Sequence, residues 1–387
     1  MKFKVAKQDL LKAINAVTPV LSTSGSDLST HYLFRRVESE ANKLEVLAFS
    51  GKLFASCPMT VQFEDDKQEM FTIVGGRFQT WLKGIPEVVI TFDYADHKTI
   101  VTLPDECNMK VPEILSLDVS AWPFWDGRLT EAVETSNLDS SRLISALEYV
   151  NKFVADDESK LPDLCMCAIK NGVIYATDRL TATSVEVAGL EKSNFNIHKT
   201  EIRNVINFLP DEGNIIVKEY PNGVTFWRED GAVLGCGSPL ATFPFFKSPG
   251  DADYCTWTLN TKELLDALPS LYAWAADDDI RLIISQDTTT KAVVFSMASA
   301  SGPGSSIKKL TCLGESMSEG PFEIPAAGFA ISYKKLQEIL IPLKGVDAVF
   351  GVNPLKNKGY LRFTETRFAD ADGKGGDKYL TLVVWLS

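Results

Sequence analysis

The sequence predicts an α+β protein built of three tandem domains, each with antiparallel sheets and two helices. The chain has 387 residues, which is too many for a single hydrophobic core. A pattern of short strand, polar cap and amphipathic helix occurs three times, and hairpin-linked strands outnumber helices in each copy. A hydrophobic fraction of 45% and a charged fraction of 23% are typical of an ordinary globular protein.

The first helix of each copy follows a short strand, in the segments FKVAKQDLLKAINAV, TSNLDSSRLISALEYV and TWTLNTKELLDALPSL. Leu10, Leu143 and Leu264 occupy one position of the pattern, and apolar residues one and four positions later complete a stripe on each helix. Asp139, Ser140 and Thr261 are residue types that cap helix N-termini. The spacing of the copies predicts domains at 1–127, 128–250 and 251–387.

The second helix of each copy is expected in GGRFQTWLKGIPE, HKTEIRNVINFLPDE and SYKKLQEILIPLKG. Each of these segments stops at a proline or glycine and continues into a strand: VVITFDY, NIIVKEY or DAVFGV. Few helices beside many hairpin-linked strands indicate antiparallel sheets covered by two helices. The domain boundaries are expected in the turn-rich stretches WDGRLTEA (125–132) and KSPGDADY (247–254).

Composition narrows the class of protein. No run of about 18 apolar residues is present, so we expect no membrane span. The N-terminal sequence MKFKVAKQDLL has no long apolar region, and the seven cysteines are an odd, scattered number, so reduced thiols and a cytoplasmic location are expected. The net charge of −12 argues against a protein coated in basic surface, but it allows one local face to meet DNA.

Motifs for catalysis or cofactor binding are missing from the sequence. The three histidines, His31, His97 and His198, stand in no recognisable serine or cysteine motif. Cys165 and Cys167 lack a second pair at zinc-binding spacing, and no P-loop motif occurs. We therefore expect no catalytic residue, no metal site, no cofactor and no enzymatic activity.

Three features leave other functions open. The acidic clusters at 156–158 and 277–279 are of a type that binds Mg²⁺, so a metal-dependent nucleic-acid-processing enzyme is the alternative function. Both clusters follow the first helix of their copy, which favours solvated turns. The aromatic run 122–125 suits either a stacking platform for single strands or packing between domains, and packing is favoured. The tandem domains also leave open a structural protein such as a virion component.

Four segments carry a resemblance to a known family. They are MKFKVAKQDLLKAINAVTPVL at the start, ATDRLTAT (176–183), LATFPFF (240–246) and KYLTLVVWLS at the end. Taken together and in this order, they resemble the bacterial DNA polymerase III beta-type sliding clamp over nearly the whole chain. The turn between Asp178 and Arg179 is shorter than in that family and lacks its glycine and histidine, and the tail also differs. These departures indicate a divergent member, such as one carried by a phage or mobile element, with a cellular or a viral origin left open.

The resemblance implies domains of the DNA-clamp type, with sheets outside and helices inside, forming half of a six-domain ring. It implies a processivity factor that encircles duplex DNA of any sequence as a homodimer and tethers the replicative polymerase without catalysing a reaction. The DNA polymerase and the clamp loader would bind through short hydrophobic peptides. Weak contacts to phosphates would permit sliding. The six expected helices together carry a slight positive charge although the chain is acidic overall.

Three sets of site residues follow. Basic residues on the expected helices are candidates for DNA contact: Lys7, Lys12, Arg77, Lys83, Arg142, Lys152, Lys199, Arg203, Lys334 and Lys335. A solvated helix face would explain these charged residues equally well. The resemblance implies a partner-peptide pocket formed by Leu164, Thr177, Arg179, Leu180, Pro244, Val383 and Val384. The sequence pattern alone would instead place Leu164 and Leu180 in strand cores. The dimer interface is expected to join the first domain to the partner's last domain, near Met109, Val111, Leu271 and Tyr272.

Overall fold

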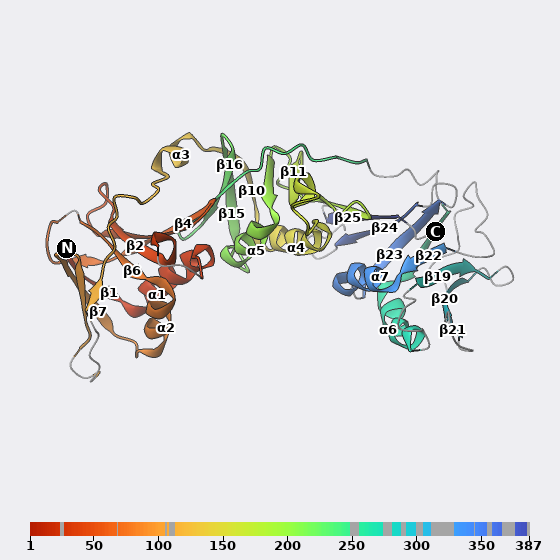
Figure 1. Ribbon diagram of the computed structural model, residues 1–387, viewed down its shortest axis with the longest axis horizontal. Helices are drawn as coiled ribbons and strands as arrows, with labels where there is room; N and C mark the ends of the chain where they lie inside the picture. The colour runs from red at the N-terminus through yellow and green to blue at the C-terminus, as the bar shows by residue number, and fades with distance from the viewer. Residues whose placement is uncertain are drawn as a thin grey trace. The chain divides into compact units, whose positions relative to one another are not determined.

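Figure 1 labels the helices and strands of the computed structural model. The chain divides into two compact units. The first contains Met1–Ile144 and Gly189–Leu240, and the second contains Ser145–Ala188 and Ala241–Ser387. The boundary falls inside α4 (Ser140–Val150), so the units do not coincide with the three expected domains, whose limits stay a prediction. The residues that the structure describes are 1–23, 27–67, 69–104, 107, 113–247, 255–273, 281–287, 292–298, 305–310, 329–343, 345–353, 358–365 and 376–384.

The first unit contains two antiparallel sheets. The smaller sheet has the strand order β5 (Gln62–Phe63), β1 (Lys2–Ala6), β7 (Val89–Ala95), β8 (Lys98–Thr102) and β9 (Ile114–Leu115). The larger sheet has the order β10 (Val133–Asp139), β15 (Asn214–Tyr220), β16 (Gly223–Arg228), β17 (Val233–Gly237), β4 (Leu53–Thr60), β3 (Lys43–Ser50), β2 (His31–Arg36) and β6 (Met70–Val74). Its β4–β17 pair joins strands of the first and second sequence copies.

Helices of the first unit stand where the apolar stripes predict them. They are α1 (Lys7–Val17), α2 (Gly75–Gly84) and α5 (Lys199–Phe208), which β14 (Asn194–His198) precedes. The single turns η1 (Thr18–Val20) and η2 (Leu28–Thr30) follow α1. α1 and α2 pack on each other, above a core where Phe3 stacks on Phe92 and Phe34 stacks on Phe71 at centroid distances of 5.0 and 4.8 Å. Stacked rings of this kind contribute beyond their buried area.

The expected boundary at 125–132 is a short helix, α3 (Asp126–Glu131), and not a turn. The guanidinium of Arg35 donates to both carboxylate oxygens of Asp126, at 2.8 and 2.9 Å. The two tryptophans of the neighbouring aromatic run are packed, as the sequence favours: Trp122 and Trp125 are buried, and Trp125 stacks on Phe54 at 4.5 Å, whereas Phe124 is exposed. These two tryptophan rings are therefore not a platform for nucleic-acid bases.

The second unit also contains two antiparallel sheets. In the larger one the strands of this unit follow the order β11 (Met166–Lys170), β12 (Val173–Thr177), β13 (Thr181–Glu186), β25 (Asp377–Val384), β24 (Lys358–Glu365), β23 (Asp347–Asn353) and β18 (Cys255–Asn260). The smaller sheet has the order β21 (Ser305–Leu310), β20 (Val293–Ala298), β19 (Arg281–Gln286) and β22 (Phe329–Ser332). The β13–β25 pair ties the middle of the chain to its last strand.

Two helices of the second unit pack on each other, α6 (Thr261–Tyr272) and α7 (Tyr333–Leu340). Asn260 caps α6 by accepting from two backbone N–H groups, so the expected cap Thr261 is wrong; its hydroxyl instead donates to the carbonyl of Val346 at 2.7 Å. Asp139 does accept from Ser141 N at the start of α4, as expected. The single turns of this unit are η4 (Asn151–Phe153), η5 (Pro162–Leu164) and η7 (Ile341–Leu343).

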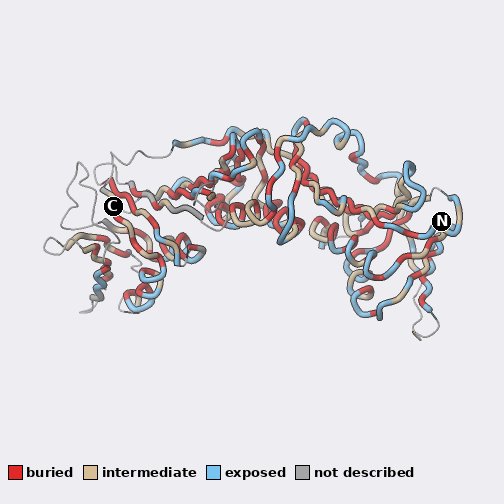
Figure 2. Tube along the Cα trace, turned by 180° about the vertical axis from the view of Figure 1, so that it is seen from behind, coloured by how far each residue is buried: buried red, intermediate tan, exposed pale blue. Residues whose placement is uncertain are grey.

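Burial follows the expected patterns in both units. Figure 2 shows buried residues running along the strands, whereas many of the connections between them are exposed. In the part of the chain that the structure describes, no helix is long and apolar enough to cross a membrane. Within the same residues, no three histidine, cysteine or acidic side chains are grouped to hold a metal ion. The acidic cluster at 156–158 forms a turn in which Asp157 accepts from Ser159 and Lys160, and the cluster at 277–279 lies outside the described residues.

Candidate functional site

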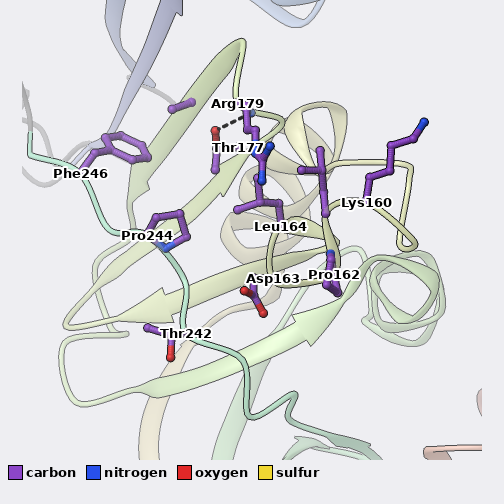
Figure 3. A pocket seen from close by; sticks show the side chains of 11 residues that line it. Lys160, Pro162, Asp163, Leu164, Thr177, Arg179, Thr242, Pro244 and Phe246 are labelled. Carbon is purple, nitrogen blue, oxygen red and sulfur yellow. Dashed lines mark hydrogen bonds between the residues drawn. The ribbon is translucent and has the colours of Figure 1, made fainter.

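A pocket of about 600 Å³ lies in the second unit, among three short segments (Figure 3). The first segment is the η5 turn with the residues before it, the second is the turn between β12 and β13, and the third is the extended stretch 242–246. The lining residues are Lys160, Leu161, Pro162, Asp163, Leu164, Thr177, Arg179, Ala182, Thr242, Pro244 and Phe246. The lining thus combines apolar side chains with two cations and one carboxylate.

The η5 wall is fixed by local turn chemistry. Pro162 stands at the first position of the turn, where its missing N–H costs nothing and its fixed φ is suitable. The Leu164 carbonyl accepts from the backbone N–H of Ala155 at 3.1 Å. The Leu164 side chain is buried with Ala155, Cys165 and the half-buried Leu161. Its burial explains why pattern alone would assign Leu164 to the core, although it also lines the pocket.

The β12–β13 turn is held by one carboxylate. Asp178 Oδ1 accepts from the backbone N–H groups of Leu180 and Thr181 at 3.0 and 2.6 Å, and from the Thr181 hydroxyl at 2.8 Å. The Thr177 hydroxyl donates to the Thr181 carbonyl at 2.7 Å and accepts from the backbone N–H of Arg179 at 3.2 Å. Asp178 and Thr177 together therefore satisfy most of the polar backbone of a very short turn.

Arg179 adopts a left-handed backbone conformation, with φ of 75°. Side chains other than glycine rarely adopt this conformation because their Cβ crowds the backbone. The turn lacks the glycine that the resemblance would place here, so Arg179 itself takes the strained position, and its side chain lines the pocket. Strain held by surrounding hydrogen bonds is common where a side chain must be aimed at a ligand.

The other carboxylate oxygen of Asp178 binds Lys335 of α7. Nζ of Lys335 lies 2.9 Å from Oδ2 of Asp178 and 5.4 Å from the ring centre of the buried Phe153. Burial alone would raise the pKa of Asp178, but the hydrogen bonds from Lys335 and Thr181 hold it below its usual value. The turn beside the pocket is therefore connected to a helix that lies outside the lining.

The third wall is the stretch 242–246, attached by its aromatic rings. Phe243 is buried against Met166 and Ala168 of β11. Phe245 and Phe246 meet the ring of Tyr175 edge-on at 5.2 and 5.4 Å. Thr242, Pro244 and Phe246 line the pocket, whereas the side chain of Phe243 between them is buried. An extended chain presents alternate residues to opposite sides, so one side is anchored while the other stays accessible.

Four of the seven predicted pocket residues lie in this lining: Leu164, Thr177, Arg179 and Pro244. Leu180 follows Arg179, is 65% exposed and is not part of the lining. Val383 is opposite Thr181 in the β13–β25 ladder and Val384 ends the strand, but their side chains lie outside the described part. The other lining residues were not predicted from the sequence: Lys160, Leu161, Pro162, Asp163, Ala182, Thr242 and Phe246. Alternation in the segment LATFPFF was the available signal for Thr242 and Phe246.

The predicted DNA-contact residues fall into two groups. Lys12, Arg77, Lys83, Lys152, Arg203 and Lys334 have exposed side chains. Lys7 is only 7% exposed, because its ammonium donates to the Ile85 carbonyl at 2.7 Å and pairs with Glu87 at 3.1 Å. Lys335 is engaged with Asp178, and Arg142 and Lys199 are partly buried with partners of their own. The basic side chains of the second group therefore already make contacts within the protein.

The predicted interface residues differ in how far they are buried and in whether the structure describes them. Leu271 is 1% exposed within its own unit, so its side chain has no area to offer to another chain. Tyr272 is half-buried and stacks on Tyr333 at 4.7 Å. Met109 and Val111 lie outside the described residues. The described strand order places β21 at a sheet edge, with Ile307 exposed on it, and β9 at the edge of the first sheet.

Comparison with known proteins gives a clear result for the fold. No family model matches the sequence, and no curated protein matches it. The structure is similar to the DNA polymerase sliding clamp from Bacillus subtilis, with a TM-score of 0.78 and 14% identity over 100% of this chain and 99% of that one. It is also similar to the DNA polymerase III subunit beta from Pseudomonas aeruginosa and to the beta subunit from the DNA polymerase of Streptococcus pyogenes, each with a TM-score of 0.77 over 100% of both chains, at 12% and 13% identity. The chain has the fold of bacterial DNA polymerase III beta sliding clamps, as the ordered sequence motifs imply.

Proposed function

We propose that this protein is a DNA sliding clamp, a non-catalytic processivity factor that encircles duplex DNA and tethers the replicative polymerase. The observation that carries the proposal is the likeness to solved clamps over the full length of both chains. A likeness of this extent covers every part that a ring-forming subunit needs, at an identity of only 12–14%. Such a clamp would work in the cytoplasm of a bacterium or of a phage host.

Two chains would join head to tail, with domains 1–127, 128–250 and 251–387 of each forming half of the ring. A head-to-tail contact that closes after two copies gives a ring and not a fibre. The edge strands β9 and β21 support this arrangement, because edge strands of two chains can pair and cover each other. The exposed Ile307 on β21 would be buried in such a contact. No observation in the described residues favours a metal-dependent enzyme.

Contacts to DNA would come from the exposed cations on the helices, such as Lys83, Arg203 and Lys334. Isolated exposed cations bind phosphate weakly and without regard to sequence, which allows the ring to slide. The net charge of −12 fits this view, because a topologically closed ring does not need strong attraction to stay on DNA.

The pocket would bind a short hydrophobic peptide of the polymerase or the clamp loader. Leu164, Pro244 and Phe246 provide apolar surface, and Lys160 and Arg179 provide positive charge for a carboxylate. A fluorescein-labelled hexapeptide ending in Leu-Phe serves as the probe, because its apolar side chains match the apolar surface of the pocket and its terminal carboxylate matches the positive charge. Saturable binding that unlabelled peptide displaces is expected, and its absence would remove the peptide pocket from the proposal.

The ring itself is tested with DNA topology. The protein is assembled at micromolar concentration on a nicked circular plasmid and passed through a sizing column in high salt. Retention on the circle and loss after linearisation are expected, whereas equal retention on both forms contradicts encirclement. Sedimentation of the free protein gives the second measurement, since a purely monomeric species at the same concentration also contradicts a two-subunit ring.

A further inference from the structure

We infer that Asp178 and Lys335 form a positioning pair that sets the shape of the peptide pocket from outside it. This inference rests on the proposed peptide-binding role of the pocket. Neither residue is part of the lining, yet Asp178 immediately precedes Arg179, which is. Peptide affinity should therefore depend on Lys335, a residue of α7 that does not contact the peptide.

The two oxygens of the Asp178 carboxylate have separate partners. Oδ1 accepts three hydrogen bonds from Leu180 and Thr181, and Oδ2 binds Nζ of Lys335 at 2.9 Å. A carboxylate is planar, so fixing Oδ2 also fixes the direction in which Oδ1 points. The ammonium of Lys335 therefore orients the acceptor that shapes the turn.

Lys335 is itself held in place by its neighbours. Ser332 caps the start of α7 by accepting from the backbone N–H of Lys335 at 3.4 Å. The ammonium lies over the ring of Phe153, a contact that is favourable for a cation, and Glu338 approaches it at 3.8 Å. Lys335 is 22% exposed and Asp178 is 24% exposed, so solvent reaches the pair only in part.

The pair is connected to the pocket wall through Arg179. Arg179 keeps its left-handed backbone only while the hydrogen bonds on both sides of it persist. If the Asp178 carboxylate turns away, the N–H groups of Leu180 and Thr181 lose their acceptor, and Arg179 is free to relax. Its side chain would then leave the position from which it lines the pocket.

A purely structural pair would behave differently. Partly exposed ion pairs contribute little to folding stability, because solvent screens them and the side chains lose entropy. Removal of this pair should therefore change the melting temperature slightly, while it changes peptide affinity strongly. The ratio of these two effects separates a positioning role from general support of the fold.

The experiment measures binding of the labelled Leu-Phe hexapeptide by fluorescence anisotropy, with melting temperature recorded for each variant. Lys335→Met should weaken binding by roughly tenfold, within the usual range for coupled neighbours. Asp178→Asn should weaken it as well, and the double variant should be no weaker than the stronger single effect. Lys335→Arg, which keeps the charge, should restore most of the affinity.

The matched control is Lys378→Met, which removes the exposed ion pair between Lys378 and Glu186 on the same β13–β25 strand pair. It should leave peptide affinity unchanged. If Lys335→Met fails to fold, the double variant replaces it, since it leaves no unpaired partly buried charge. Wild-type affinity in the Lys335 variant would overturn the inference and leave the pocket standing. A wild-type protein that is retained on circular DNA but binds no peptide would instead refute the pocket, and the inference with it.

Discussion

Glu201 shows how one residue can make the stability of this fold depend on pH. It lies in the first turn of α5, is 5% exposed and accepts a hydrogen bond from the backbone N–H of His198. Its Oε2 atom has no hydrogen-bond partner. Burial raises the pKa of Glu201 to about 7, and the nearby charge of Lys52 opposes the rise only in part.

The sign of the effect follows from linkage. The folded pKa exceeds the unfolded value, so this contribution to stability is complete below about pH 4.5 and is lost as pH rises through about 7. Glu201→Gln should remove the dependence and stabilise the protein at pH 8.5 by up to about 3 kcal/mol. Urea denaturation at pH 5.5 and 8.5 measures this, with the exposed Glu212→Gln as control. Equal pH dependence in both variants would show that Glu201 does not titrate in this range.

Arg179 offers a second prediction at the residue scale. Arg179→Gly and Arg179→Ala both remove the guanidinium, but only glycine adopts φ of 75° without strain. The glycine variant should therefore be more stable than the alanine variant by on the order of 1 kcal/mol. Both should bind the labelled hexapeptide more weakly than the wild type. Equal stability of the two variants in denaturant titrations would mean that the turn relaxes when the side chain is lost.

Residues of this kind mark the limit of prediction from sequence. The segment ATDRLTAT indicated a turn at Asp178, but not that Arg179 would take the left-handed position or that Lys335 would bind Asp178. The two partners are 157 residues apart, and no periodic pattern connects them. The burial of Lys7 could not be predicted from the sequence either, since its hydrogen-bond partner Ile85 is 78 residues away.

At the scale of elements, sequence periodicity predicted helices better than caps and connections. The six expected helices are present because their apolar stripes have a helical period. The α6 cap was misplaced by one residue, since Asn260 and Thr261 are both good capping types and tertiary contacts decide between them. Helix α3 was missed because its first residue is held by Arg35 of a distant strand, an interaction that local composition cannot indicate.

The extended wall 242–246 yields a prediction for an element without regular structure. Phe243 is buried against β11, whereas Phe245 is partly exposed and lies under Lys170 at 4.7 Å. Phe243→Ala should cost about 3 to 4 kcal/mol of stability and weaken peptide binding, because the wall loses its anchor. Phe245→Ala should cost much less. Comparable losses in urea denaturation would show that Phe243 is not the main anchor of this wall, because the exposed ring would then contribute as much as the buried one.

For the whole molecule, the four ordered motifs carried the resemblance to clamps, and the threefold repeat was enough to predict the fold class. It could not predict which strands would share a sheet. The pairing of β4 with β17 merges strands of two sequence copies, and β13 with β25 joins residues about 200 positions apart. Edge pairing of this type depends on register and twist across the assembled domains, which one strand's sequence does not specify.

The exposed and the buried basic side chains should contribute differently to DNA binding by the assembled ring. Binding to a short linear duplex at low salt reports phosphate contacts without topological retention, and the slope of log affinity against log salt counts the counterions released. Lys83→Ala should lower this slope by about one for each phosphate contact removed, without affecting stability, because its side chain is exposed. Lys7→Met should lower stability, because it removes the buried hydrogen bond to the Ile85 carbonyl, but it should leave the salt slope unchanged. A lower slope in the Lys7 variant would mean that its ammonium leaves Ile85 and Glu87 for phosphate when DNA is bound.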